Sequence, residues 1–158
     1  MNTRLFTRLP RLALAVASLA VMVLTPASHA TASTTRYQAT FIEIGGNQGD
    51  RSCGSATISR LGHVAFQCVV FDACGPNCEE RTITFDDGST LLIQESIVGF
   101  VSPGNSSAGG ENAPLFIQIT QTIVGGSGRF EGATGSGTGI VNVAANAVII
   151  ASGTITLP

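Results

Sequence analysis

The chain has 158 residues, with eight basic side chains against ten acidic ones and a formal net charge of −2. All eight basic residues are arginines; three lie within the first 11 residues, and the five in residues 31–158 are scattered instead of forming a stripe. Nucleic acid and anionic lipid surfaces are bound by basic patches or stripes, so we expect neither as a partner. The length is sufficient for one domain with a sizeable core.

The first 30 residues have the features of a secretory signal peptide. Three arginines precede an apolar run over residues 12–24, and Ser28-His29-Ala30 supplies small residues at the two positions that a signal peptidase reads. The apolar run is shorter than the roughly 20 residues that cross a bilayer. We therefore predict a secreted or periplasmic protein without a membrane span, in which residues 31–158 form one domain.

Helical periodicity is absent from residues 31–158, where apolar and polar side chains alternate. Eight stretches fit short strands joined by Gly, Asn and Asp turns. The predicted strands span residues 35–44, 54–60, 63–72, 80–86, 89–98, 114–124, 137–144 and 147–157. Strands with one apolar and one polar face are typical of antiparallel sheets, and eight of them indicate a barrel or a sandwich. An outer-membrane barrel would need aromatic girdles, whereas the chain has no Trp and one Tyr.

Residues 125–139 contain seven glycines and one large apolar residue, Phe130. Glycine permits left-handed backbone and close approach of neighbouring chains, so we predict a tight reversal between two strands with Phe130 anchored in the core. A phosphate site fits poorly, because Gly126 and Gly128 are followed by Glu131 where a dinucleotide fingerprint has glycine, and the chain has no lysine. The predicted turn residues are Gly126, Gly128, Phe130, Gly132 and Gly135.

The run Gly-Gly-Ser-Gly-Arg-Phe-Glu-Gly-Ala-Thr-Gly at residues 125–135 resembles the Gly-Gly-x-Gly-x-Phe…Ala-x-Gly segment of the dirigent and allene oxide cyclase-like barrel superfamily. The resemblance covers residues 115–144. It implies an all-β fold, an eight-stranded antiparallel closed β-barrel, in a group that is often exported and has bacterial members of unknown role. The cysteine-bearing segment 53–78 departs from the family pattern. The family's acidic and arginine functional residues find no matching positions outside the motif, so the resemblance assigns no catalytic residue.

Four cysteines, Cys53, Cys68, Cys74 and Cys78, lie in the segment that we expect to be exported. An even number in an oxidising compartment points to disulfides, and four cysteines allow three pairings. The spacing favours Cys53–Cys68 across an apparent hairpin and Cys74–Cys78 around Cys-Gly-Pro-Asn-Cys. A four-cysteine zinc site fits less well, because such sites use close pairs separated by about two residues. We expect no metal and no cofactor.

Two polar residues share a strand face with apolar side chains. Glu95 falls on the face of Ile93 and Ile97, and Gln121 falls on the face of Ile119. A buried carboxylate is costly unless it is paired or protonated, and desolvation gives a carboxyl group a raised pKa that suits acid–base chemistry. The functional hypothesis is that both residues line a cavity and orient a ligand. The alternative places Glu95 near the barrel mouth, exposed to water or paired with an arginine.

Other titratable residues give weaker signals. Glu43 lies on a strand whose two faces both mix apolar and polar residues, and His63, at a turn, has no Ser-Asp frame for a nucleophilic triad. Arg129 and Glu131 are expected to form a solvated rim of the glycine-rich turn. The long segment 102–112 is interpreted as either a lid or a disordered loop.

Three functions remain open from the sequence. The first is binding of a small apolar molecule inside the barrel, which a small closed barrel can accommodate. The second is a cofactor-independent cyclase or isomerase in which Glu95 steers a reactive intermediate. The third is a structural or envelope interaction protein with a filled core. The scarcity of catalytic groups favours the first and the third, and a filled interior would favour the third.

Overall fold

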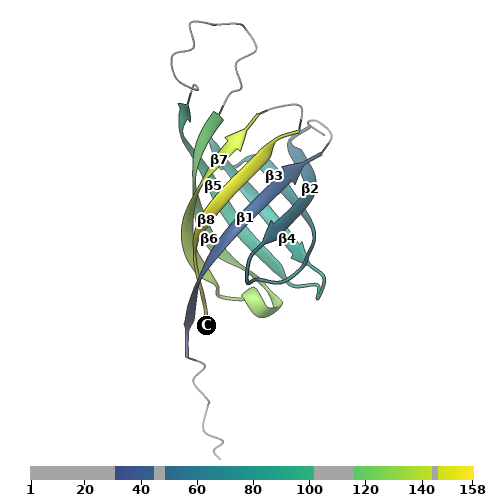
Figure 1. Cartoon of the computed structure of the whole chain (residues 1–158), viewed down its shortest axis with the longest axis vertical. Helices are drawn as coiled ribbons and strands as arrows, with labels where there is room; N and C mark the ends of the chain where they lie inside the picture. The colour runs from purple at the N-terminus through teal and green to yellow at the C-terminus, as the bar shows by residue number, and fades with distance from the viewer. Residues whose placement is uncertain (1–30, 45–48, 102–115, 144–145) are drawn as a thin grey trace, which may run out of the picture.

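The computed structural model describes residues 31–44, 49–101, 116–143 and 146–158. In this part of the chain, eight strands form a closed antiparallel barrel, in which β1 pairs with β8 (Figure 1). The strands are β1 (Ser33–Glu43), β2 (Arg51–Ile58), β3 (Val64–Gly75), β4 (Cys78–Phe85), β5 (Thr90–Val101), β6 (Phe116–Ser127), β7 (Thr134–Asn142) and β8 (Val148–Leu157). The predicted eight-stranded antiparallel β-barrel is confirmed.

Alternation along the strands decides which side chains enter the barrel. On β6, Ile119, Gln121 and Ile123 are buried, whereas Thr120 and Thr122 are exposed. Strand neighbours point to opposite faces, so the apolar face predicted for this segment is the inner face of the barrel. The inner faces of the eight strands together supply one continuous apolar core.

The reversal at the glycine-rich stretch is shorter than predicted. Gly126 belongs to β6 and Gly135 belongs to β7, and a 3-10 turn, η1 (Gly128–Phe130), lies between the strands. Gly128 and the later Gly132 have φ angles of 61° and 71°, which L side chains adopt at a cost. The other glycines of this stretch are strand residues. Gly125, with a φ of 131°, lies at a bulge of β6, whereas Gly126, Gly135, Gly137 and Gly139 pack closely against neighbouring atoms.

Phe130 closes one end of the barrel, as predicted from its place among the glycines. Its side chain is 1% exposed and its ring centroid lies 4.7 Å from that of Phe85. In Figure 1, η1 lies at the same end of the barrel as the C-terminus. Arg129 and Glu131 are exposed, as predicted for the rim of this turn. Arg129 makes contacts as well: its guanidinium carbon lies 4.6 Å from both ring centroids, and its Nε lies 3.2 Å from Asp87. The arginine thus covers the aromatic pair.

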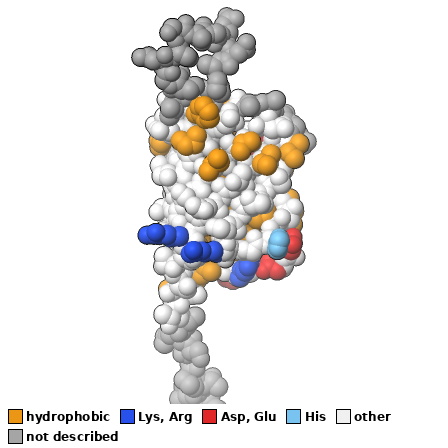
Figure 2. All heavy atoms as spheres, viewed as in Figure 1, with side chains coloured by type: hydrophobic (Ala, Val, Ile, Leu, Met, Phe, Trp, Pro, Cys, Tyr) orange, Lys and Arg blue, Asp and Glu red, His pale blue; other side chains and the backbone are white. Residues whose placement is uncertain are grey.

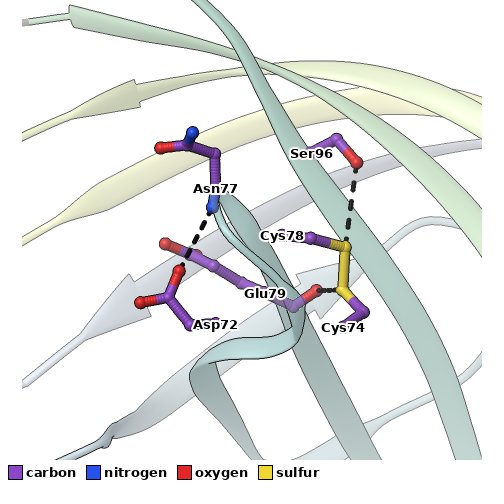
Figure 3. Close-up of a disulfide and its surroundings, with 6 residues drawn as sticks. All are labelled: Asp72, Cys74, Asn77, Cys78, Glu79 and Ser96. Atoms are coloured by element: carbon purple, nitrogen blue, oxygen red, sulfur yellow. Dashed lines mark hydrogen bonds between the residues drawn. A yellow bond between two sulfur atoms is a disulfide. The ribbon is translucent and has the colours of Figure 1, made fainter.

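Both predicted disulfides are present. Cys53 and Cys68 are direct cross-strand partners on β2 and β3, and the Cys74–Cys78 bond closes the β3–β4 hairpin (Figure 3). The two bonds span 15 and 4 residues, so in the chain-entropy account each stabilises the fold by about 2–3 kcal/mol. Disulfides persist in oxidising compartments, which fits the predicted export.

The tip of the β3–β4 hairpin is fixed by more than the disulfide. Asp72 and Asn77 have φ angles of 54° and 60°, and the backbone N–H of Asn77 donates to the Asp72 carboxylate over 3.2 Å (Figure 3). Both residue types tolerate left-handed backbone better than most. This tip sets the start of β4, from which Glu79 and Arg81 project.

Several predictions concern residues outside the described ranges. These are the signal peptide over residues 1–30 and the segment 102–112. Within the described ranges, no helix is long and apolar enough to cross a membrane.

Candidate functional site

A band of polar side chains crosses the barrel interior. On β5, Glu95 lies between the inward-facing Ile93 and Ile97, and on β6, Gln121 lies between Ile119 and Ile123. One row of cross-strand partners runs over six strands and consists of Glu79, Glu95, Gln121, Gly137, Gly153 and Tyr37. The row brings together the two residues that the sequence predicted to share the interior.

Arg81 on β4 is the centre of this band and is 1% exposed. Its Nε and Nη2 donate to the two carboxylate oxygens of Glu95 at 3.0 and 2.9 Å. Nη2 also donates to Glu43 over 3.0 Å, and Nη1 donates to the amide oxygen of Gln67. The Phe41 ring lies 4.5 Å from the guanidinium carbon. Arg81 therefore ties β4 to β5, β1 and β3 through charge-assisted hydrogen bonds.

A second chain of hydrogen bonds continues from Glu95. The amide nitrogen of Gln121 donates to Glu95 over 2.7 Å, and the Tyr37 hydroxyl donates to the amide oxygen of Gln121 over 2.9 Å. Each of these three residues is at most 3% exposed. Because buried polar groups without partners are costly, these bonds explain how a carboxylate and an amide are held inside an apolar core.

Two glycines make room for the tyrosine. Gly137 and Gly153 face each other on β7 and β8. A Cβ atom at Gly137 would lie 2.5 Å from the Tyr37 hydroxyl oxygen, and one at Gly153 would lie 2.8 Å from it. Tyr37 thus lies over the bare backbone of two strands and reaches Gln121 on a third. Gly137 and Gly153 are therefore a packing requirement of the polar band.

The interior carries more carboxylates than cations. Burial lowers the pKa of Arg81, but attraction and hydrogen bonds from Glu95 and Glu43 outweigh burial and raise that pKa. Burial, with a contribution from Glu95, raises the pKa of Tyr37 to about 12, which keeps its hydroxyl a neutral donor. Burial and the nearby Glu95 likewise raise the pKa of Glu79 from 4.5 to about 7 against the opposing effect of Arg81.

The raised pKa of Glu79 predicts a pH-dependent stability. The folded protein holds this proton more tightly than the unfolded chain, so the unfavourable contribution of Glu79 grows between pH 4.5 and about 7 and is constant above. Allowing for solvent screening of a half-buried group, we expect Glu79→Gln to stabilise the fold by about 1–2 kcal/mol above pH 7.

Urea denaturation of both proteins across this pH range measures the effect. The two should have equal stability below pH 4.5, where Glu79 is protonated in both states. Glu80→Gln, at the neighbouring residue on the opposite strand face, is the matched control for the loss of one carboxylate from β4. A constant difference between Glu79→Gln and the parent at every pH would contradict the titration argument.

The structure adds partners that the sequence did not identify. The prediction that Glu95 and Gln121 lie inside is confirmed, and pairing of Glu95 with an arginine was one of the predicted alternatives. That arginine, Arg81, was not named, and Glu43 was given little weight although its carboxylate contacts Arg81. Arg81 and Ile83 lie two residues apart on β4 and therefore on the same strand face, so the apolar Ile83 could have indicated that Arg81 also points into the barrel.

The outer wall carries a groove of about 1360 Å³ that crosses β6, β7, β8, β1 and β2. We call it the outer groove. Its lining includes the outward-facing Gln38, Thr40, Thr57, Thr120, Thr138 and Ser152, together with the core residues Ala39, Ile58, Ile119 and Ala151 that lie between them along the strands. Figure 2 shows part of this wall. Apolar side chains lie toward one end of it, arginine side chains lie toward the other end, and uncharged polar residues lie between them.

The comparisons leave the family of this chain open. No known protein family, curated protein or solved structure matches it.

Among the residues that the structure describes, no group of three or more His, Cys, Asp and Glu side chains is arranged to hold a metal ion. His63 lies at the β2–β3 turn and lines the outer groove, away from the polar band.

Proposed function

We propose that this protein is an exported interaction module whose barrel interior is a structural core and whose outer wall binds its partner. The observation that carries this proposal is that bulky side chains of the chain itself occupy the barrel interior. Arg81, Phe41, Phe85 and Phe130 are among the largest fully buried side chains of the described chain. A core filled by its own side chains leaves the outside as the surface for recognition.

The hydrogen bonds of the polar band support the same conclusion. Both oxygens of Glu95 accept from Arg81, and one of them also accepts from Gln121. The amide of Gln121 uses its nitrogen for Glu95 and its oxygen for Tyr37. A ligand that used Glu95 or Gln121 would have to replace bonds that already satisfy these groups. The same engagement argues against Glu95 as the carboxylate of a cyclase or isomerase.

The second candidate is a small molecule bound inside the barrel, the function that would use Glu95 and Gln121. One observation favours it: Nε2 of Gln67 is buried and has no hydrogen-bond partner among the described residues. A buried unpaired donor is costly, and an acceptor on a ligand would satisfy it. The excess of carboxylates over Arg81 would further favour a ligand that carries a basic group next to its apolar body.

We also propose that this chain is a member of the dirigent and allene oxide cyclase-like superfamily. Its supports are the motif at residues 125–135 and the closed barrel of eight antiparallel strands. Export is supported by the two disulfides and by the composition of residues 1–30.

Native mass spectrometry of the protein purified from its own exported fraction tests the filled-core proposal. We expect a bare mass, lower by the four hydrogens that two disulfides remove, even after apolar and basic candidates are offered. A stoichiometric adduct of a few hundred daltons (roughly what such a pocket holds) that Glu95→Gln abolishes would overturn the filled-core proposal. Glu131→Gln, at an exposed residue, is the control and should leave the spectrum unchanged.

A further inference from the structure

The arginines of the described chain divide into two groups. Residues 31–158 contain five: Arg36, Arg51, Arg60, Arg81 and Arg129. Three of them pair with carboxylates, since Arg51 lies near Asp50, Arg81 binds Glu43 and Glu95, and Arg129 lies near Asp87. Arg36 and Arg60 form no ion pair with any described carboxylate. They are therefore the two arginines with charge available for a partner.

Both of these arginines lie at the same end of the outer groove. Arg60 lines the groove itself, and Arg36 and Arg60 together line an adjoining hollow of about 550 Å³. The two depressions share Gln38, Ser59, Arg60 and Ser152, so they are continuous. No Asp or Glu is among the described residues that line either one. The combined surface has a cationic end and a neutral, hydroxyl-rich floor.

Arg60 lies at the β2–β3 turn with a backbone conformation that is uncommon for a long side chain. Arg60 has a φ of 67°, in the left-handed region that favours Gly, Asn or Asp at a turn. Non-glycine residues held in this region cluster at binding and active sites, where the cost is retained for the position of the side chain. A long basic side chain therefore occupies a turn position where a smaller residue would be less strained.

The dimensions and chemistry of the groove select an extended ligand. Five neighbouring strands spaced roughly 4.8 Å apart span about 20–25 Å across the wall. The floor offers Thr and Ser hydroxyls and Gln amides, together with the exposed Ile140 and Ile150. Hydroxyls and amides match the hydroxyl groups of sugars, the two isoleucines can contact their apolar faces, and Arg guanidinium groups match carboxylates.

We propose that the outer groove and the adjoining hollow together bind an extended acidic polysaccharide, with Arg36 and Arg60 on its carboxylates and the hydroxyl and amide side chains on its sugar hydroxyls. This inference rests on the proposed function, in which the outer wall is the binding surface. Residues 31–158 carry ten acids against five arginines, so overall charge repels an anionic polymer. Binding therefore depends on the local pair of arginines.

Titration of the purified exported protein with an oligogalacturonate long enough to cross about five strands tests the inference. Calorimetry should detect saturable binding that weakens with salt, with no binding of a neutral malto-oligosaccharide. Arg36→Gln with Arg60→Gln should weaken binding about tenfold or more, because two charge-assisted contacts are lost. Arg51→Gln, at an exposed arginine away from the groove, is the matched control and should leave affinity unchanged.

A separate variant excludes misfolding as the cause. Arg60→Asn places a residue that tolerates left-handed backbone at this turn, so affinity should fall while the melting temperature does not. Binding that survives the double substitution, absence of binding to the uronate probe, or equal displacement by free acetate would overturn the polysaccharide site. If the titration shows no binding and the native mass is bare, the polysaccharide site is wrong but the filled-core proposal stands. If the native mass shows a molecule bound inside the barrel, the filled-core proposal itself is wrong.

Discussion

Replacing Arg81 by Met should destabilise the barrel by about 3–5 kcal/mol, because a buried ion pair loses one partner and leaves uncompensated charge in the core. Glu95 is 1% exposed and would lose both of its hydrogen bonds from the guanidinium, while Glu43 and Gln67 would each lose one. A loss of this size is a large share of the roughly 5–15 kcal/mol that stabilises a typical domain. Urea denaturation near neutral pH measures it.

Two comparisons separate charge from packing in this prediction. Arg51→Met removes an exposed arginine whose Nε lies 3.9 Å from Asp50, and it should cost less than about 1 kcal/mol. Adding Glu95→Met to Arg81→Met should recover stability, since the buried carboxylate goes with its partner. A loss that is the same with and without Glu95→Met would contradict the charge argument.

The fold was predictable because its determinants are local. Alternation on β6 and β8 and turn residues such as Gly62 and Gly88, which adopt φ angles of 97° and 80°, are visible in sequence and specify antiparallel strands. Register is less visible. The β5–β6 pairing shifts by one residue near Ile93, where Gly125 has a φ of 131°. With this bulge, β6 continues to Ser127, past residue 124, where the sequence predicted the strand to end.

The polar band was only half predictable for the same reason. Parity alone placed Glu95 and Gln121 inside, because each follows an apolar series along its own strand. The alternation along one strand does not indicate which other strands lie around Arg81. The contacts of Arg81 to Glu43 on β1 and to Gln67 on β3 depend on how the barrel closes. The irregular pairing near Val64 on β3 further hid the inward position of Gln67.

Gly137→Ala should destabilise the barrel by about 2–3 kcal/mol, although alanine is ordinarily preferred over glycine within a strand by about 0.5–1 kcal/mol. The new Cβ would lie 2.5 Å from the Tyr37 hydroxyl oxygen, 2.7 Å from the backbone oxygen of Ser152 and 3.1 Å from the amide oxygen of Gln121. Tyr37 would have to move, and its hydrogen bond to Gln121 would be lost. Tyr37 is the only tyrosine in a chain without tryptophan, so its ultraviolet absorbance reports this displacement directly.

Two further variants decide whether the tyrosine causes the loss. Gly139→Ala lies on the same inner face of β7, but its Cβ would meet its nearest neighbours at 3.2 Å, so its cost should be smaller. In a Tyr37→Phe background the hydroxyl is absent, and Gly137→Ala should cost about 1 kcal/mol less than in the parent, as expected for coupled neighbours. If Gly137→Ala costs the same in both backgrounds, close backbone packing against β8 requires the glycine, and the tyrosine does not. The predicted coupling instead makes the glycine, the tyrosine and the buried carboxylate one cooperative unit inside the barrel.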